Sequence, residues 1–137
     1  MTSRILHAAD GMEVRTETLP RRAESAATGR RIVRATLQDW ALGDLVDAAE
    51  LVVTELIANA VQHARCDSVR LTVRRTEGEG VHVAVTDRSH QVPVLRLPGP
   101  AAQAGRGLAI VDSLAERWGH DPLPWGKRVW AELAGSS

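Results

Sequence analysis

The sequence predicts an α+β fold, a two-layer sandwich in which helices cover one face of a mixed or mostly antiparallel sheet. Two stretches of alternating apolar residues, 68–75 and 80–87, are separated by a short turn, which indicates a hairpin of neighbouring antiparallel strands. Long segments rich in helix-forming residues precede them. Such a hairpin excludes a purely parallel doubly wound sheet, and the helices need a sheet against which to bury their apolar sides.

The first part of the chain predicts one strand and two helices. Residues 12–19 alternate well enough for a strand, which Pro20 ends. Residues 21–42 are rich in Ala, Arg, Glu and Gln and predict a helix. Gly43 breaks this pattern, and a second helix is expected over 44–65, with acidic residues in its first turns, where they suit the helix dipole.

After the hairpin, the sequence predicts a loop, a helix and a closing strand. Residues 88–104 contain Pro and Gly without clear periodicity, and a loop of this length in a compact domain is usually functional. Gly105-Arg106-Gly107 then begins a helix that is expected over 108–118 and ends at Gly119. A turn is expected over 121–124 and a last strand over 127–133.

Composition places the chain among globular proteins and excludes several functions. Its 137 residues fit a single domain, 1–137, with a workable core. The formal net charge of zero argues against nucleic-acid binding and against an electrostatic membrane anchor. Cys66 is the only cysteine, and neither a signal-peptide pattern nor an apolar run of about 20 residues is present, so the expected location is the cytoplasm.

The most informative segment is the second predicted helix, which carries Glu55 and Asn59 four residues apart. That spacing places both on one face, opposite a side of apolar residues. A core-packed helix therefore presents an acid and an amide to something other than the core, and buried polar groups need partners. Taken alone, the pattern favours ordinary helix-surface positions for the two residues.

Other candidate residues occur later in the chain and are individually weak. Asp87 ends a predicted strand, Gly105 and Gly107 precede Leu108 at a helix start, and Lys127 begins the last strand. Asp87 could simply begin a turn, the glycines could serve a loop, and Lys127 could be a solvated charge. Together they make sense as a nucleotide pocket. Glycines at a helix start let backbone N–H groups approach a phosphate closely, and a carboxylate can accept a hydrogen bond from the amino group of adenine.

The ordered set resembles the GHKL ATP-binding superfamily, which includes histidine-kinase catalytic domains, gyrase-type ATPases and anti-sigma factor kinases. Residues 55–64, Glu-x-x-x-Asn-Ala-x-x-His-Ala, are similar to its N box. Asp87 falls where its first glycine box begins, residues 105–108 resemble its second, and residues 126–130 resemble the last box of small actinobacterial members. The similarity covers about 21–133, and the chain length favours the stand-alone anti-sigma factor branch over a histidine kinase.

The resemblance implies a GHKL fold that binds ATP and Mg²⁺, with Asn59 coordinating the metal and Glu55 as general base. Asp87 would hold the adenine, residues 105–108 (Gly105, Gly107 and Leu108 among them) would contact phosphate, 88–104 would form an ATP lid, and Lys127 would contribute to the pocket. The implied activity is an ATP-dependent protein serine/threonine kinase that regulates transcription. Its partners would be a sigma factor and a STAS-domain anti-anti-sigma factor, and a homodimer is compatible with the resemblance.

One departure keeps alternatives open. The first glycine box usually continues Asp-x-Gly-x-Gly, whereas here Asp87 is followed by Arg-Ser-His-Gln. Side chains in place of those glycines predict a narrower adenine site or weaker affinity. The alternative to a kinase is a non-catalytic nucleotide-binding module that sequesters a protein partner, and a third reading is a plain structural α/β domain with chance motifs.

Overall fold

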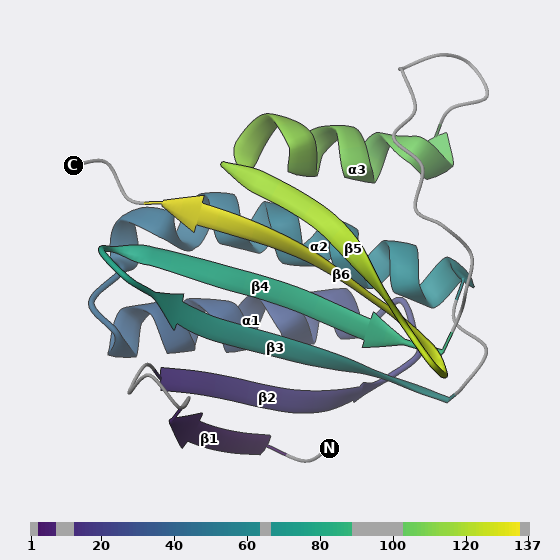
Figure 1. Ribbon diagram of the computed structural model, residues 1–137, viewed down its shortest axis with the longest axis horizontal. Coiled ribbons are helices and arrows are strands. Elements are labelled where there is room, and N and C mark those ends of the chain that lie inside the picture. Colours follow the sequence, from purple (N-terminus) through teal and green to yellow (C-terminus); the bar gives the residue numbers. More distant parts are fainter. Residues whose placement is uncertain (1–2, 8–12, 64–66, 89–102, 135–137) are drawn as a thin grey trace.

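The computed structural model describes residues 3–7, 13–63, 67–88 and 103–134. Figure 1 shows the arrangement of their strands and helices. In chain order the elements are β1 (Ser3–His7), β2 (Glu13–Pro20), α1 (Ser25–Asp39), a 3-10 turn η1 (Gly43–Leu45), α2 (Val46–His63), β3 (Ser68–Thr76), β4 (Gly80–Asp87), α3 (Gln103–Leu114), β5 (Arg117–Leu123) and β6 (Gly126–Ala134).

The strands form one six-stranded sheet in the order β1-β2-β3-β4-β6-β5, and every neighbouring pair is antiparallel. The predicted hairpin is confirmed, because β3 pairs with β4 from Arg70 opposite Thr86 to Thr76 opposite Gly80. The chain crosses over after β4, so β6 lies beside β4 and β5 forms an edge of the sheet.

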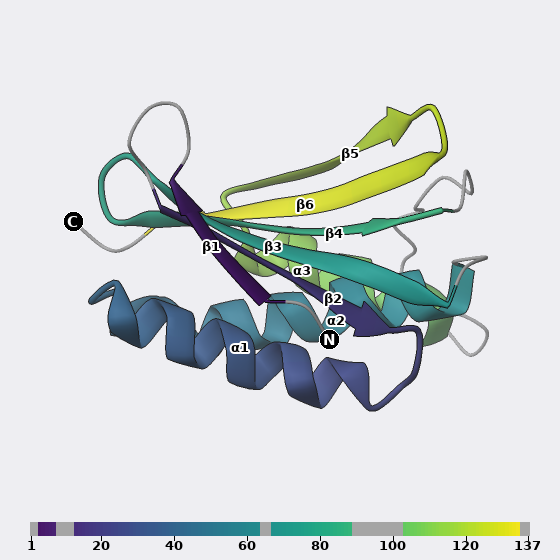
Figure 2. The same cartoon turned by 90° about the horizontal axis from the view of Figure 1, so that it is seen from below.

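The helices cover one face of the sheet and leave the other open, as Figure 2 shows. Within this layer α2 lies between α1 and α3 and also packs on β4 and β6. The predicted fold class is therefore confirmed: a two-layer α+β sandwich with helices on one face. Among the described helices, none combines the length and apolar character needed to cross a membrane.

The core lies between α2 and the central strands, where alternate strand residues point toward the helices. Val69, Leu71 and Val73 of β3 are buried, as are the odd-numbered valines of β4 and the apolar side of α2. Gly29 brings α1 close to α2, because a Cβ there would overlap the side chain of Ile57. Burial of these apolar side chains is what holds the helix layer on the sheet.

Three elements, α3, β5 and β1, differ from the sequence-based expectation. The helix expected over 108–118 is α3, which begins at Gln103 and ends at Leu114. The next residues turn away, and β5 occupies the segment where a helix end and a turn were expected. Pro122 fits there because β5 is an edge strand, where a missing backbone donor is tolerated. β1 was not anticipated at all.

Candidate functional site

Glu55 and Asn59 lie on the flank of α2 that faces α3. The opposite flank contacts α1: Arg34 pairs with Glu50 at 2.9 Å, and Arg30 donates to the Thr54 hydroxyl at 3.0 Å. At 3.6 residues per turn, the two flanks are roughly 140° apart around the helix axis. Because α2 lies between α1 and α3, the acid and the amide point toward the α3 side of the helix layer.

Glu55 is partly buried, and this burial raises the pKa of its carboxyl above the ordinary value of 4.5. Desolvation disfavours the charged form, so the carboxylate holds a proton more strongly than a glutamate in water. A carboxylate with a raised pKa is a better proton acceptor for a hydroxyl group. The environment of Glu55 is therefore compatible with the predicted general base.

The side chain of Asn59 contains a buried polar atom whose hydrogen-bonding capacity is unsatisfied by the described residues. Its side-chain nitrogen Nδ2 is buried and has no hydrogen-bond partner among the described residues. The nitrogen and oxygen of an amide are assigned from their surroundings, so the observation concerns the amide as a whole. Leaving such a group unsatisfied costs free energy, and a bound ligand at this position would remove that cost.

Asp87 and Lys127 form a buried ion pair at one end of the sheet. They stand directly opposite each other on β4 and β6, and Lys127 Nζ lies 3.2 Å from Asp87 Oδ1. Their exposed fractions are only 1% and 2%. Both side chains point to the helix-covered face, the face on which α2 packs.

Gly126 allows this end of β6 to lie close to Asp87. A Cβ at Gly126 would overlap the Asp87 carbonyl oxygen and would lie 2.8 Å from the Cα of Arg88. Only glycine lacks that atom, so the residue that precedes Lys127 sets how near the two strands approach. The glycine of the last predicted box thus has a packing role next to the ion pair.

The predicted phosphate-binding glycines lie inside α3 and not before it. Because α3 begins at Gln103, Gly105 is within its first turn and Gly107 lies just past it, which corrects the expected helix start. The first amide groups of a helix lack intrahelical partners, and Gly105 belongs to that set. Leu108 is 2% exposed, so it anchors this end of α3 in the molecule.

Three elements bring the predicted residues to the same end of the molecule. Figures 1 and 2 show the C-terminal end of α2, the end of β4 and the beginning of α3 there. Asn59, Asp87 and Gly105 come from these ends. The predicted lid over 88–104 falls almost entirely on residues 89–102, which lie outside the described part of the chain, as do the residues of the first glycine box after Arg88.

The described residues fit a magnesium ion that is held mainly by a nucleotide. They contain no group of three His, Cys, Asp or Glu side chains that could hold a metal by themselves. Mg²⁺ commonly takes one or two protein oxygens together with phosphate oxygens and water. The side-chain oxygen of Asn59 would suit one such ligand position, and the buried Nδ2 of the same amide has no partner among the described residues.

The pairing of Asp87 with Lys127 was not anticipated, although the sequence holds a signal for it. Val81, Val83 and Val85 share a phase with Asp87, so alternation places this charge on the covered face. Lys127 is likewise in phase with the buried residues of its own strand, Val129, Ala131 and Leu133. When two strands each place an opposite charge among their core-facing residues, the two charges are expected to pair, provided that the strands are neighbours.

Comparisons with known proteins agree with this geometry. The histidine kinase-like ATPase domain family matches residues 19–131. An uncharacterized protein of Streptomyces coelicolor is 39% identical over 88 residues, which are 61% of this chain and 82% of that protein. The histidine kinase domain of a blue-light activated histidine kinase from Erythrobacter litoralis EL346 has the same fold, with a TM-score of 0.50 and 19% identity.

The structural match covers 84% of this chain, which spans 61% of the solved histidine kinase domain. The family match extends over residues 19–131, which include α1, α2, β3, β4, α3 and β5 and most of β6. It therefore contains every predicted site residue from Glu55 to Lys127. The chain belongs to the histidine kinase-like ATPase domain family.

Proposed function

We propose that the chain binds ATP with Mg²⁺ between α2, α3 and the end of β4 and acts as a regulatory protein serine/threonine kinase. The family match supports nucleotide binding. The observation that carries the proposal is the α2 flank: Glu55 with its raised pKa and Asn59 with its buried amide face α3 together. Bound Mg-ATP would supply the transferable phosphoryl group and offset its charge.

Glu55 has the properties required of the residue that receives a proton from the substrate hydroxyl. Its burial raises the pKa, so it is a stronger base than an exposed glutamate. Asn59, one helical turn away on the same flank, would hold the metal and thereby fix the phosphates relative to that base. Proximity of base and metal ligand on one rigid helix is what a phosphoryl-transfer site needs.

Asp87 has the role of adenine recognition in this proposal. Lys127 Nζ lies 3.2 Å from Asp87 Oδ1 and fixes the position of this carboxylate at the end of β4. A carboxylate offers about four acceptor positions, so one bond to Lys127 leaves capacity for an amino group. A buried acceptor selects adenine, which has an exocyclic amine, over guanine, which has a carbonyl there.

The proposed partners are a sigma factor and a STAS-domain anti-anti-sigma factor, which are what the resemblance to the anti-sigma factor branch implies. Residues 55–64 and 105–108 support the superfamily, and residues 126–130 resemble the last box of its small actinobacterial members. Both partners would use one surface of the domain. Phosphorylation of the antagonist on Ser or Thr would weaken its binding by like-charge repulsion and desolvation, which would return the domain to the sigma factor.

Phosphoryl transfer can be tested with Glu55→Gln. The variant and the wild type are incubated with labelled Mg-ATP and a STAS-domain protein from the same genome, and the rate of phosphoprotein formation is measured. We expect Glu55→Gln to lower this rate by about 10²- to 10⁴-fold, because it removes the base. Glu50→Gln is the matched control on the opposite flank of α2 and should leave the rate near wild type. Equal labelling by Glu55→Gln and wild type would contradict the role of Glu55.

The second candidate is a regulatory module without turnover, in which nucleotide only stabilises a partner-binding conformation. The Asp87–Lys127 pair favours this second candidate, because Lys127 already takes up hydrogen-bonding capacity of the carboxylate that would recognise adenine. The same assay separates the two functions. Binding of Mg-ATP and of the partner without any phosphoprotein would support the module.

A further inference from the structure

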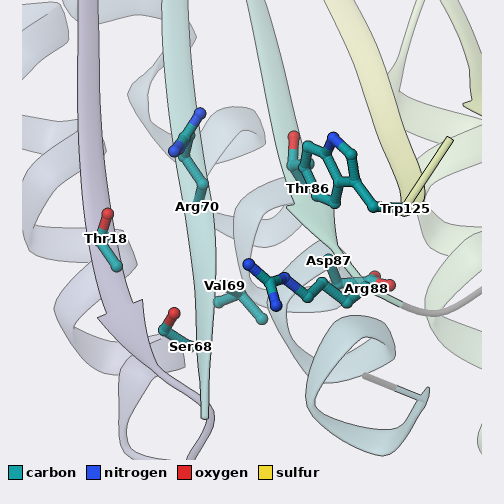
Figure 3. A pocket seen from close by; sticks show the side chains of 8 residues that line it. All are labelled: Thr18, Ser68, Val69, Arg70, Thr86, Asp87, Arg88 and Trp125. Atoms are coloured by element: carbon teal, nitrogen blue, oxygen red, sulfur yellow. The ribbon is translucent and has the colours of Figure 1, made fainter. Parts of the chain in front are cut away.

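The open face of the sheet carries a cavity of about 210 Å³, separate from the helix-covered site. Figure 3 shows its lining, to which β2, β3, β4 and the turn between β5 and β6 contribute. Val69 and Asp87 also border the cavity, but their side chains are buried and point to the covered face. The cavity and the proposed nucleotide site thus lie on opposite faces of the same end of β4.

Strand register assembles the polar lining of this cavity. Thr18 lies opposite Arg70, and Arg70 lies opposite Thr86, so these three side chains form one row across β2, β3 and β4. Arg88 follows Thr86 by two residues and extends over the same face, as Figure 3 shows. Trp125, which is 50% exposed, places its indole beside Thr86 from the β5–β6 turn.

The two arginines of the cavity have no acidic partner in the part of the chain that the structure describes. Among the described residues, neither Arg70 nor Arg88 forms an ion pair. Other arginines on this face do: Arg117 pairs with Glu132, and Arg128 with Asp121. Of the described residues that line the cavity, Asp87 is the only acid, and Lys127 pairs with it from the covered side. The cavity therefore presents net positive charge to solvent.

We propose that this cavity is a binding site for a phosphate monoester. Guanidinium groups form bidentate hydrogen bonds with phosphate oxygens, and the hydroxyls of Thr18 and Thr86 supply further donors. The exposed indole of Trp125 offers an apolar surface to the group that carries the phosphate. The volume is below the roughly 300–1,000 Å³ typical of drug-sized ligands, which suits a small organic phosphate or one phosphorylated side chain.

This site does not depend on nucleotide binding or on kinase activity. The side chains that would bind the phosphate, those of Thr18, Arg70, Thr86 and Arg88, lie on the open face. Asp87 borders the cavity, but its side chain points to the covered face. Loss of ATP binding would leave the proposal standing, and absence of phosphate binding would leave the proposed kinase standing. The two are therefore tested by separate measurements.

The experiment is calorimetric titration of the full chain with three probes in the absence of ATP. Phenyl phosphate represents a free small molecule, a phosphoserine pentapeptide represents a modified protein, and the same peptide without phosphate is the negative probe. We expect at least one phosphate probe to bind, and its affinity to fall about tenfold or more in Arg70→Ala and in Arg88→Ala. Preference for phenyl phosphate or for the peptide identifies the source of the ligand.

Arg74→Ala is the matched control, because Arg74 lies on the same strand and face as Arg70 but outside the cavity. It removes the same charge and should change affinity less than twofold. Circular dichroism verifies folding of each variant, and Arg70→Lys, which keeps the charge but loses the planar fork, should bind with intermediate affinity. Absence of binding by both phosphate probes, or equal losses in Arg74→Ala and Arg70→Ala, would overturn the proposal.

Discussion

Two polar pairs join the same strands, β4 and β6, and differ in the face on which they lie. His82 stands opposite Glu132, and Asp87 stands opposite Lys127. Asp87 follows His82 by five positions, an odd number, so alternation places the first pair on the open face and the second beneath the helices. His82 also stacks on Trp130 with ring centroids 5.3 Å apart, while Arg117 donates to Glu132 from β5.

The comparison teaches that the environment, and not the strand pairing, decides what such a pair does. On the open face, Glu132 has two partners and access to solvent, which is an ordinary surface arrangement. On the covered face, two charges have been removed from water, and their attraction repays that cost only in part. The net contribution of the Asp87–Lys127 pair to stability is therefore small, even though removing one partner alone is costly.

Breaking the buried pair should have the largest effect. Lys127→Met removes the positively charged partner of the buried Asp87 carboxylate, and we expect a loss of about 3–5 kcal/mol in the free energy of unfolding, measured with urea. The double variant Asp87→Asn/Lys127→Met removes both charges and should recover most of this loss. A loss below about 1 kcal/mol in Lys127→Met would show that the pair is not desolvated as described.

The close approach of β6 to β4 predicts an intermediate effect. Gly126→Ala introduces a Cβ that overlaps the Asp87 carbonyl, so the strands must separate at a cost of about 1–3 kcal/mol. Gly43→Ala is the control, because nothing lies within 4 Å of its Cβ position, and it should change stability by less than about 0.5 kcal/mol. Equal thermal midpoints for the two variants would contradict the contact at Gly126.

The open-face pair predicts the smallest effect, and it depends on pH. Burial lowers the pKa of His82 below 6.5, against the opposing effect of its bond to Glu132. Below pH 6.5 the unfolded chain therefore binds a proton that the folded chain does not, and stability falls as the pH decreases. His82→Gln should flatten the dependence of the urea midpoint on pH between 6.5 and 4.5.

Glu132 contributes in the same direction at lower pH. Its bond to His82 lowers the pKa of its carboxyl below 4.5, so its stabilisation is present above that pH and is lost as the pH falls further. Glu132→Gln should therefore differ from wild type in the pH dependence of its stability mainly in the more acidic range.

For the His82 prediction, a steeper loss of stability in His82→Gln than in wild type just below pH 6.5 would contradict the neutral state of His82.

Most elements of the fold could be predicted because their patterns are local. β4 shows strict alternation between a glycine turn and Asp87, and its bounds, 80–87, match the prediction. β5 was missed because Gly119, Asp121 and Pro122 are turn formers in sequence, whereas an edge strand tolerates them through pairing on one side only. The end of α3 was misplaced because apolar residues continue past Leu114 into Trp118, which instead donates to Asp112.

The candidate site was predictable in its residue types but not in its pairings. The spacing of Glu55 and Asn59 fixes a common helix face without knowledge of any neighbour. The Asp87–Lys127 pair depends on β6 lying next to β4, and a crossover through α3 and β5 decides that order. Likewise, Arg70, Arg88 and Trp125 meet only after three strands and a distant turn come together.

The most direct test of the central claim is calorimetric titration of the chain with ATP, with and without Mg²⁺. We predict binding by the wild type that strengthens with Mg²⁺ and a loss of about tenfold or more in Asn59→Ala, while Thr54→Ala, on the α1 flank of the same helix, binds as wild type does. No binding by the wild type, or unchanged magnesium-dependent affinity in Asn59→Ala, would contradict a nucleotide site built on this flank of α2.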